Sequence, residues 1–88
     1  MEIKKAKLLV EDILDICTQL GEENLNDSCS GIYNDLQVAT SVEQIVLISR
    51  ELMIFVGDSP WDEMDGGEDL KNEIEKIFNE LIEEFEEF

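Results

Sequence analysis

The spacing of the apolar residues constrains the fold of this chain most. Over about residues 68–88 they recur every three or four positions, and glutamates fill the opposite side. This is the period of an amphipathic α-helix with one apolar face. No segment alternates polar and apolar residues cleanly over many positions, so strands are disfavoured. The apolar stripe of this helix comprises Leu70, Ile74, Ile77, Leu81, Phe85 and Phe88, supported by Phe78 and Ile82.

Two earlier segments show the same period. The first runs over about residues 3–20 and ends at Gly21, a residue type that commonly follows helix C-termini. The second has its apolar face over residues 25–36 and ends before Thr40. Gly31 in its middle costs about 1 kcal/mol relative to Ala, so we expect this helix to start late or to be irregular. The two apolar faces are Ala6, Leu9, Ile13, Ile16, Cys17 and Leu20, and Leu25, Cys29, Ile32, Tyr33 and Leu36.

A third helix is predicted over residues 42–56. Ser41 provides a cap at its start, and Gln44 stands three residues further on as the partner that bonds back. The segment is apolar on most sides, so we expect it to be buried at the centre of the fold. The run Ile45–Ile48 also suits a buried strand, and this alternative stays open.

The connection between the third and fourth helices contains another helix start. Ser59 followed by Pro60 predicts a short helical turn, with Ser as the cap and Pro at the first position, and Gly66 and Gly67 end it. Because the connections are short, neighbouring helices should run antiparallel. The sequence therefore predicts an all-α fold: a compact antiparallel four-helix bundle with this helical turn, in one domain over residues 1–88.

The net charge restricts the partners of the chain. Six Lys and Arg face 23 Asp and Glu, which gives a formal net charge of −17. A small domain needs a magnitude of only about 2 to 8 for solubility. Direct binding to nucleic acid or to an anionic membrane is disfavoured, because both are polyanions. A cationic protein surface is the favoured partner, and surface acidity for solubility alone is the alternative.

The residue types that most often carry catalysis or hold metals are missing. The chain has no His and no phosphate-binding Gly-Lys loop, and the acids around Gly66 and Gly67 fail the ligand spacing of an EF-hand. We therefore expect no catalytic residue, no metal, no cofactor and no enzymatic activity. Cys17 and Cys29 are expected to be reduced thiols in the core of a cytoplasmic protein, because no secretory signal or membrane-spanning run is visible.

One stretch of the chain concentrates the acids: no Lys or Arg occurs between Glu51 and Leu70. Its carboxylates suit the Lys and Arg with which a nuclease holds nucleic acid, and a solvated loop is the alternative. Trp61, the only tryptophan, is expected to seal the core, to contact a partner, or to do both with one ring face buried and the edge exposed, since Trp is enriched at binding hot spots. The predicted partner-binding residues are Asp58, Trp61, Asp62, Glu63, Asp65, Glu68 and Asp69.

Within this stretch the chain resembles a known family. Asp65-Gly66-Gly67, followed by Leu70-Lys71, Glu73 and Ile77, resembles an acid-glycine turn that leads into a Leu-Lys-x-Glu amphipathic C-terminal helix. On these residues, and in its size, acidity and helicity, the chain resembles the small acidic immunity proteins of tRNA-cleaving bacterial toxins, of the colicin D and contact-dependent growth inhibition kinds. The resemblance implies a helical antitoxin that neutralises a basic nuclease toxin, a tRNase, by covering its active site with carboxylates.

Two other functions fit the same sequence. A phage-type inhibitor that mimics nucleic acid, such as an anti-CRISPR or anti-restriction protein, would use the glutamates of the fourth helix. A helical interaction module without an inhibitory role would carry the charge for solubility alone. The oligomeric state stays open, with Phe85 and Phe88 as candidate dimer contacts. The fourth-helix glutamates are Glu73, Glu75, Glu80, Glu83, Glu84, Glu86 and Glu87.

Overall fold

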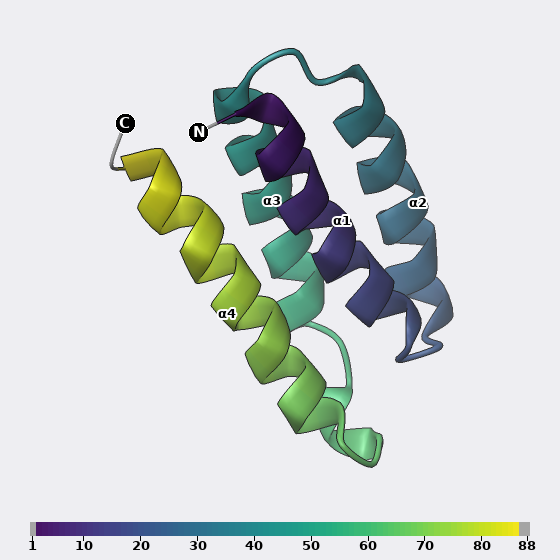
Figure 1. The fold of residues 1–88 in the computed structure, drawn as a ribbon. Helices are drawn as coiled ribbons and strands as arrows, with labels where there is room; N and C mark the ends of the chain where they lie inside the picture. Colours follow the sequence, from purple (N-terminus) through teal and green to yellow (C-terminus); the bar gives the residue numbers. More distant parts are fainter. Residues whose placement is uncertain (1, 87–88) are drawn as a thin grey trace.

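Four α-helices joined by short connections form the fold of the computed structural model, which describes residues 2–86 (Figure 1). They are α1 (Ile3–Thr18), α2 (Glu23–Val38), α3 (Val42–Gly57) and α4 (Gly67–Glu86), with a short 3₁₀ helix, η1 (Trp61–Glu63), before α4. Successive helices run in opposite directions. No strand occurs in the described residues, which confirms the all-α four-helix bundle and decides against a strand at Ile45–Ile48.

Because successive helices run in opposite directions, the connections between them lie alternately at the two ends of the bundle. The α1–α2 turn and residues 58–66, here called the η1 loop, lie at one end (Figure 1). The α2–α3 connection lies at the other end, together with the start of α1 and the last described turn of α4. Segments that are far apart in sequence therefore meet at the η1-loop end.

Helix α2 begins earlier and runs more regularly than expected. It continues through Gly31 without a break, so the predicted late start or irregularity is wrong. The Glu22 carboxylate accepts hydrogen bonds from the backbone N–H groups of Asn24 (3.1 Å) and Leu25 (2.7 Å). These two bonds satisfy N–H groups that the first turn of a helix otherwise leaves free. Capping by a glutamate thus starts the helix at Glu23.

The start of α3 confirms the predicted capping residues, with one difference. The Ser41 hydroxyl accepts a hydrogen bond from the Gln44 backbone N–H at 3.2 Å. The Gln44 side-chain oxygen accepts from the backbone N–H of Thr40 at 2.7 Å, one residue before the position that a standard capping box uses. Both ends of the motif are satisfied, which fixes the direction in which the chain enters α3.

Every α-helix and η1 contribute to one hydrophobic core. Cys17 and Cys29 are both free and buried in it, as the sequence predicts. Ser49 is its buried polar side chain, and its hydroxyl donates to the Val46 carbonyl oxygen at 2.7 Å. The buried apolar residues are Ala6, Val10, Ile13, Leu14, Cys17, Leu25, Cys29, Ile32, Leu36, Ala39, Ile45, Val46, Leu52, Val56, Trp61, Ile74 and Leu81.

Helix α3 is not buried all round, so the expectation of a central buried helix is wrong. Its inner face packs against the other three α-helices. Leu47 and Ile54 lie on the opposite side, seven residues apart, and their side chains are 62% and 65% exposed. In a bundle of four helices each helix buries only the face that points toward the core, so an apolar residue on the outer face stays in contact with water.

Helix α4 places its apolar stripe on the core, with Ile74 and Leu81 buried. Phe85 is partly buried against the core, and Phe88 lies outside the described residues. The predicted helix over 68–88 therefore agrees with α4 as far as Glu86. Among the described helices, none combines the length and the apolarity needed to cross a bilayer.

Candidate functional site

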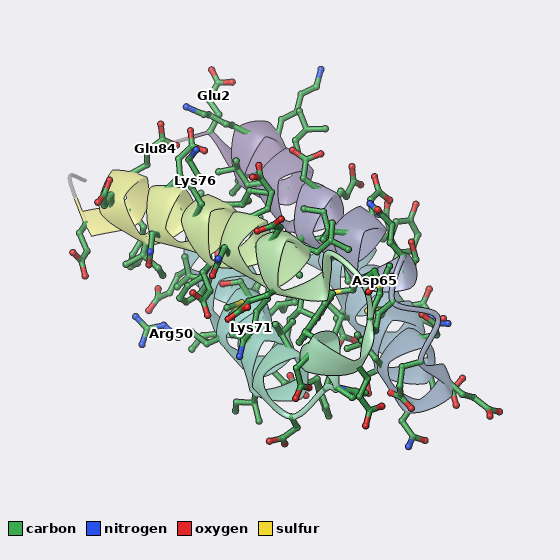
Figure 2. All side chains as sticks on the ribbon, turned by 90° about the horizontal axis from the view of Figure 1, so that it is seen from below. Glu2, Arg50, Asp65, Lys71, Lys76 and Glu84 are labelled. Carbon is green, nitrogen blue, oxygen red and sulfur yellow. The ribbon has the colours of Figure 1, made fainter. Side chains whose placement is uncertain are left out.

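The six predicted carboxylates all lie exposed around the η1 loop. They come from three consecutive elements, so the end of α3, the loop and the start of α4 present them together. Figure 2 shows Asp65 far from Glu84, which lies near the opposite end of the molecule. Asp58 follows α3 as its C-cap, Asp62 and Glu63 lie in η1, Asp65 lies in the turn before α4, and Glu68 and Asp69 lie in the first turn of α4.

The side chain of Trp61 attaches this loop to the hydrophobic core. Its side chain is only 3% exposed, and its Nε1 donates a hydrogen bond to the Val56 carbonyl oxygen at 2.8 Å. Of the two expectations for this residue, the structure shows the core residue. A direct contact of Trp61 with a partner stays a prediction, confined to the small part of the side chain that remains exposed. The buried ring holds the start of η1 against the end of α3, next to the exposed carboxylates of Asp62 and Glu63.

Ser59 and Pro60 do not start η1 in the predicted way. The Ser59 hydroxyl donates back to the Phe55 carbonyl oxygen at 2.8 Å, so it closes the end of α3 instead of capping η1. Pro60 is the residue before η1 rather than its first residue. A 3₁₀ helix of three residues has few free N–H groups to cap, so the bond to the end of α3 takes precedence. The loop is thereby tied to α3 by Ser59 and by Trp61.

Two glycines close the loop for different reasons. Gly66 has a φ of +75°, a left-handed conformation that side chains disfavour. Gly67 passes so close to η1 that a Cβ atom there would lie 1.9 Å from the Trp61 carbonyl oxygen. The sequence predicted a turn at these glycines, but the close approach depends on the tertiary position of η1.

The six carboxylates have no ion-pair partner within residues 2–86. The ion pair found there joins Lys5 to Glu84 at the other end of the bundle. A hydrogen bond with Glu84 raises the pKa of Lys5 above its ordinary value. The positive end of the α4 dipole stabilises the negative charges of Glu68 and Asp69. Both side chains are still exposed to a cationic partner.

The fold brings two further acids to the end of the bundle that carries the η1 loop. The α1–α2 turn brings Glu22 and Glu23 to the end that carries the η1 loop. A surface hollow of about 340 Å³ joins the two regions, and its wall includes both Glu22 and Asp58. The predicted antiparallel order of the helices was the signal for this proximity, because in such a bundle the first and third connections lie at the same end.

The glutamates of α4 form a second acidic surface. Glu73, Glu75, Glu80, Glu83 and Glu86 are exposed, whereas Glu84 is partly buried and paired with Lys5; Glu87 lies outside the described residues. Lys76 is exposed among them and interrupts the row of negative charge. The η1 loop has no such cation, so it is the stronger candidate for binding a cationic surface.

The arrangement suits binding by charge. No group of three or more carboxylates or thiols in the described residues converges to hold a metal ion. Exposed, unpaired carboxylates form charge-assisted hydrogen bonds with the guanidinium and ammonium groups of a partner. The chain matches no protein-family model, and no curated protein and no solved structure matches it.

Proposed function

We propose that this chain is an immunity protein, acting in the cytoplasm, that binds and neutralises a basic nuclease toxin. The observation that carries the proposal is the group of six exposed carboxylates around the η1 loop, none of which has an ion-pair partner within residues 2–86. Their mutual repulsion costs stability, so a use outside the fold is expected. The resemblance of the stretch from Asp65 to Ile77 to tRNase immunity proteins favours a tRNA-cleaving toxin.

The physical mechanism is competition for cations. A nuclease holds the phosphates of its substrate with Lys and Arg. Carboxylates held in a fixed arrangement form charge-assisted hydrogen bonds with the same groups and exclude the nucleic acid. The net charge of −17 also attracts a basic partner over a distance and raises the association rate at low salt. No cofactor and no chemical step by this chain is needed.

The proposal predicts that the neighbouring reading frame encodes a nuclease toxin, and the test mixes that product with the purified protein in a tRNA-cleavage assay. The loop variant Asp62→Lys/Glu63→Lys/Asp65→Lys should abolish inhibition while the helical circular dichroism signal persists. The matched control is Glu73→Lys/Glu75→Lys/Glu83→Lys on α4, which changes the net charge by the same amount. That control should keep most of the inhibition, because its side chains lie outside the η1 loop.

Each other result has a distinct meaning. Equal loss in both variants would show that total charge, rather than the loop, decides binding. Loss in the α4 variant alone would favour an inhibitor that mimics nucleic acid along α4. Failure of the unmodified protein to inhibit the nuclease, at both low and moderate salt, would refute the proposed function.

A further inference from the structure

Apolar side chains lie exposed along the seam between α2 and α3. Leu47 and Ile54 on α3 point away from the core, and Val38 at the end of α2 is 76% exposed. Exposed apolar side chains are common one at a time, but a contiguous group marks an interaction surface. Val38 and Leu47 line the same hollow, so these two residues form one surface across two helices, and Ile54 continues the face of α3 that carries Leu47, seven residues further on.

The seam has a hollow at each end. One, of about 320 Å³, lies between the end of α2 and the start of α3, and the other is the 340 Å³ hollow beside the η1 loop. Gly31 belongs to the α2 row of Ser28, Asp35 and Val38, by its spacing of three, four and seven residues. A Cβ atom at Gly31 would meet nothing within 4 Å, so the seam stays open between the hollows. The hollows are lined by Asp35, Val38, Ala39, Gln44, Leu47 and Ile48, and by Glu22, Asn24, Leu25, Ser28, Phe55, Asp58, Ser59 and Pro60.

Acids surround the apolar residues of this seam. Glu43, Leu47, Glu51, Ile54 and Asp58 follow one another at spacings of four, four, three and four residues, so they share the outer face of α3. Asp35 adds a carboxylate from the α2 side. An occupant that buries the leucine and isoleucine and pairs with these acids must itself be apolar on one side and cationic on its flanks.

From this arrangement we propose that the α2–α3 seam holds an amphipathic, cationic helix of the partner protein. A helix as long as the 16 residues of α3 spans about 24 Å, so one partner helix can follow the seam from end to end. In helix-in-groove binding the bound helix supplies the apolar anchors, at positions i, i+3, i+4 and i+7, so the partner helix should carry its apolar residues at this spacing. The seam ends at Asp58, so the partner helix would continue the contact made by the η1 loop.

Charge decides against the other occupants of an apolar seam. A second copy of this chain would bring another −17 charges to the interface. An anionic membrane surface would be repelled in the same way. Arg50 is exposed on the same outer face of α3, three residues after Leu47 and four before Ile54, and the three acids Glu43, Glu51 and Asp58 outnumber it there. The identity of the occupant as part of a basic protein rests on the proposed function.

The test uses two labelled peptides of leucine and lysine, about 18 residues long, with the same composition. In one, leucines recur every three or four residues; in the other, the order is scrambled so that leucines lie on all sides. The amphipathic peptide should bind more tightly by fluorescence anisotropy and shift the Gly31 amide signal in NMR spectra. The variant Leu47→Gln/Ile54→Gln should weaken this binding about tenfold or more, without weakening that of the scrambled peptide.

Two further variants separate binding from folding. Gly31→Trp fills the seam with a residue of better helix propensity than glycine, so it should block the amphipathic peptide in a folded protein. Leu8→Gln removes another exposed leucine, which is 51% exposed on α1, and should leave binding unchanged. Equal binding of the two peptides, or full binding by Gly31→Trp, would overturn the proposal. So would dimerisation that Leu47→Gln/Ile54→Gln abolishes in sedimentation experiments, because it would identify a second copy as the occupant.

The peptide test and the nuclease test can fail separately. Peptide binding at the seam without nuclease inhibition would retain the groove and refute the proposed function. Nuclease inhibition that persists in Leu47→Gln/Ile54→Gln, without preference for the amphipathic peptide, would retain the proposed function and refute the groove.

Discussion

The indole Nε1 of Trp61 donates a 2.8 Å hydrogen bond to the carbonyl oxygen of Val56, in the last turn of α3. This bond joins a buried side chain to the helix from which the acidic loop departs. The carboxylates of Asp62 and Glu63 follow Trp61 directly and are exposed. One residue therefore couples the hydrophobic core to the position of the proposed binding surface.

Replacing Trp61 should cost stability in proportion to what is removed. Trp61→Phe loses the hydrogen bond and part of the ring, and should lower the free energy of unfolding by about 1–2 kcal/mol. Trp61→Ala also leaves a cavity and should cost about 3–5 kcal/mol. Urea denaturation measures both changes. Tyr33→Phe, at an exposed site, should stay within about 0.5 kcal/mol. Equal stability of Trp61→Phe and the unmodified protein would contradict this role.

Gly67 should be the glycine least tolerant of alanine. The added Cβ would lie 1.9 Å from the Trp61 carbonyl oxygen, so the backbone of η1 or α4 must move. We expect Gly67→Ala to lower the free energy of unfolding by about 2 kcal/mol or more, or roughly 8–16 °C in melting temperature. Gly57→Ala is the control, since nothing lies within 4 Å there, and it should be neutral or stabilising. Similar melting temperatures for the two variants would contradict the close approach.

Helix positions could be predicted from the sequence because apolar spacing records which side of each helix meets the core. The start of α2 could not, because Glu22 is not among the residue types that usually cap helices. The exposure of Leu47 was also hidden, since an apolar residue has the same appearance in sequence whether a neighbour covers it or not. Only the arrangement of α1, α2 and α4 around α3 decides that.

For the candidate site, too, some features could be predicted from the sequence and others could not. The six acids around the η1 loop could be found from the absence of Lys and Arg between Glu51 and Leu70. Whether Trp61 points inward depends on the path from Val56 to Gly67, which local spacing does not specify. The contribution of the α1–α2 turn follows from helix order, and it appears only when the bundle is assembled.

The buried thiols should make stability depend on alkaline pH. The hydrogen bond with Cys29, and then burial, raise the pKa of the Cys17 thiol above its usual value of 9.0. Below pH 9.0 this thiol is protonated in the folded and in the unfolded chain, so it makes no difference. Well above pH 9.0 the unfolded chain releases both thiol protons, whereas the folded pair keeps the proton of Cys17, because their shared hydrogen bond raises the pKa of Cys17 and lowers that of Cys29. The free energy of unfolding should then fall, by at most about 1.4 kcal/mol per pH unit.

Denaturation experiments between pH 8 and pH 10 measure this effect. In this range the Lys5–Glu84 ion pair should persist, because the pKa of Lys5 is raised. The variant Cys17→Ala/Cys29→Ala should lack the fall in stability that begins near pH 9.0; both thiols are replaced because burial alone would raise the pKa of the Cys29 thiol once Cys17 is absent. If the unmodified protein and this double variant showed the same pH dependence, titration of the buried thiols would not be its cause.

Neutralising the acidic loop should stabilise the fold at low salt. The variant Asp62→Asn/Glu63→Gln/Asp65→Asn removes three exposed charges that have no ion-pair partner within residues 2–86. We expect a gain of about 0.5–1 kcal/mol, or roughly 4 °C in melting temperature, because like charges separated by less than the Debye length repel. Added salt should raise the melting temperature of the unmodified protein and raise that of the variant less.

The comparison with α4 decides whether the location of the charge matters. Glu73→Gln/Glu75→Gln/Glu83→Gln removes the same number of charges from a helix that also carries Lys71 and Lys76. This α4 variant should therefore gain less stability than the loop variant, whose substitutions lie in a stretch without Lys or Arg. A larger gain in stability from the α4 variant would place the main repulsion on α4. It would contradict the expectation that the acids of the loop are kept for binding at a cost in stability.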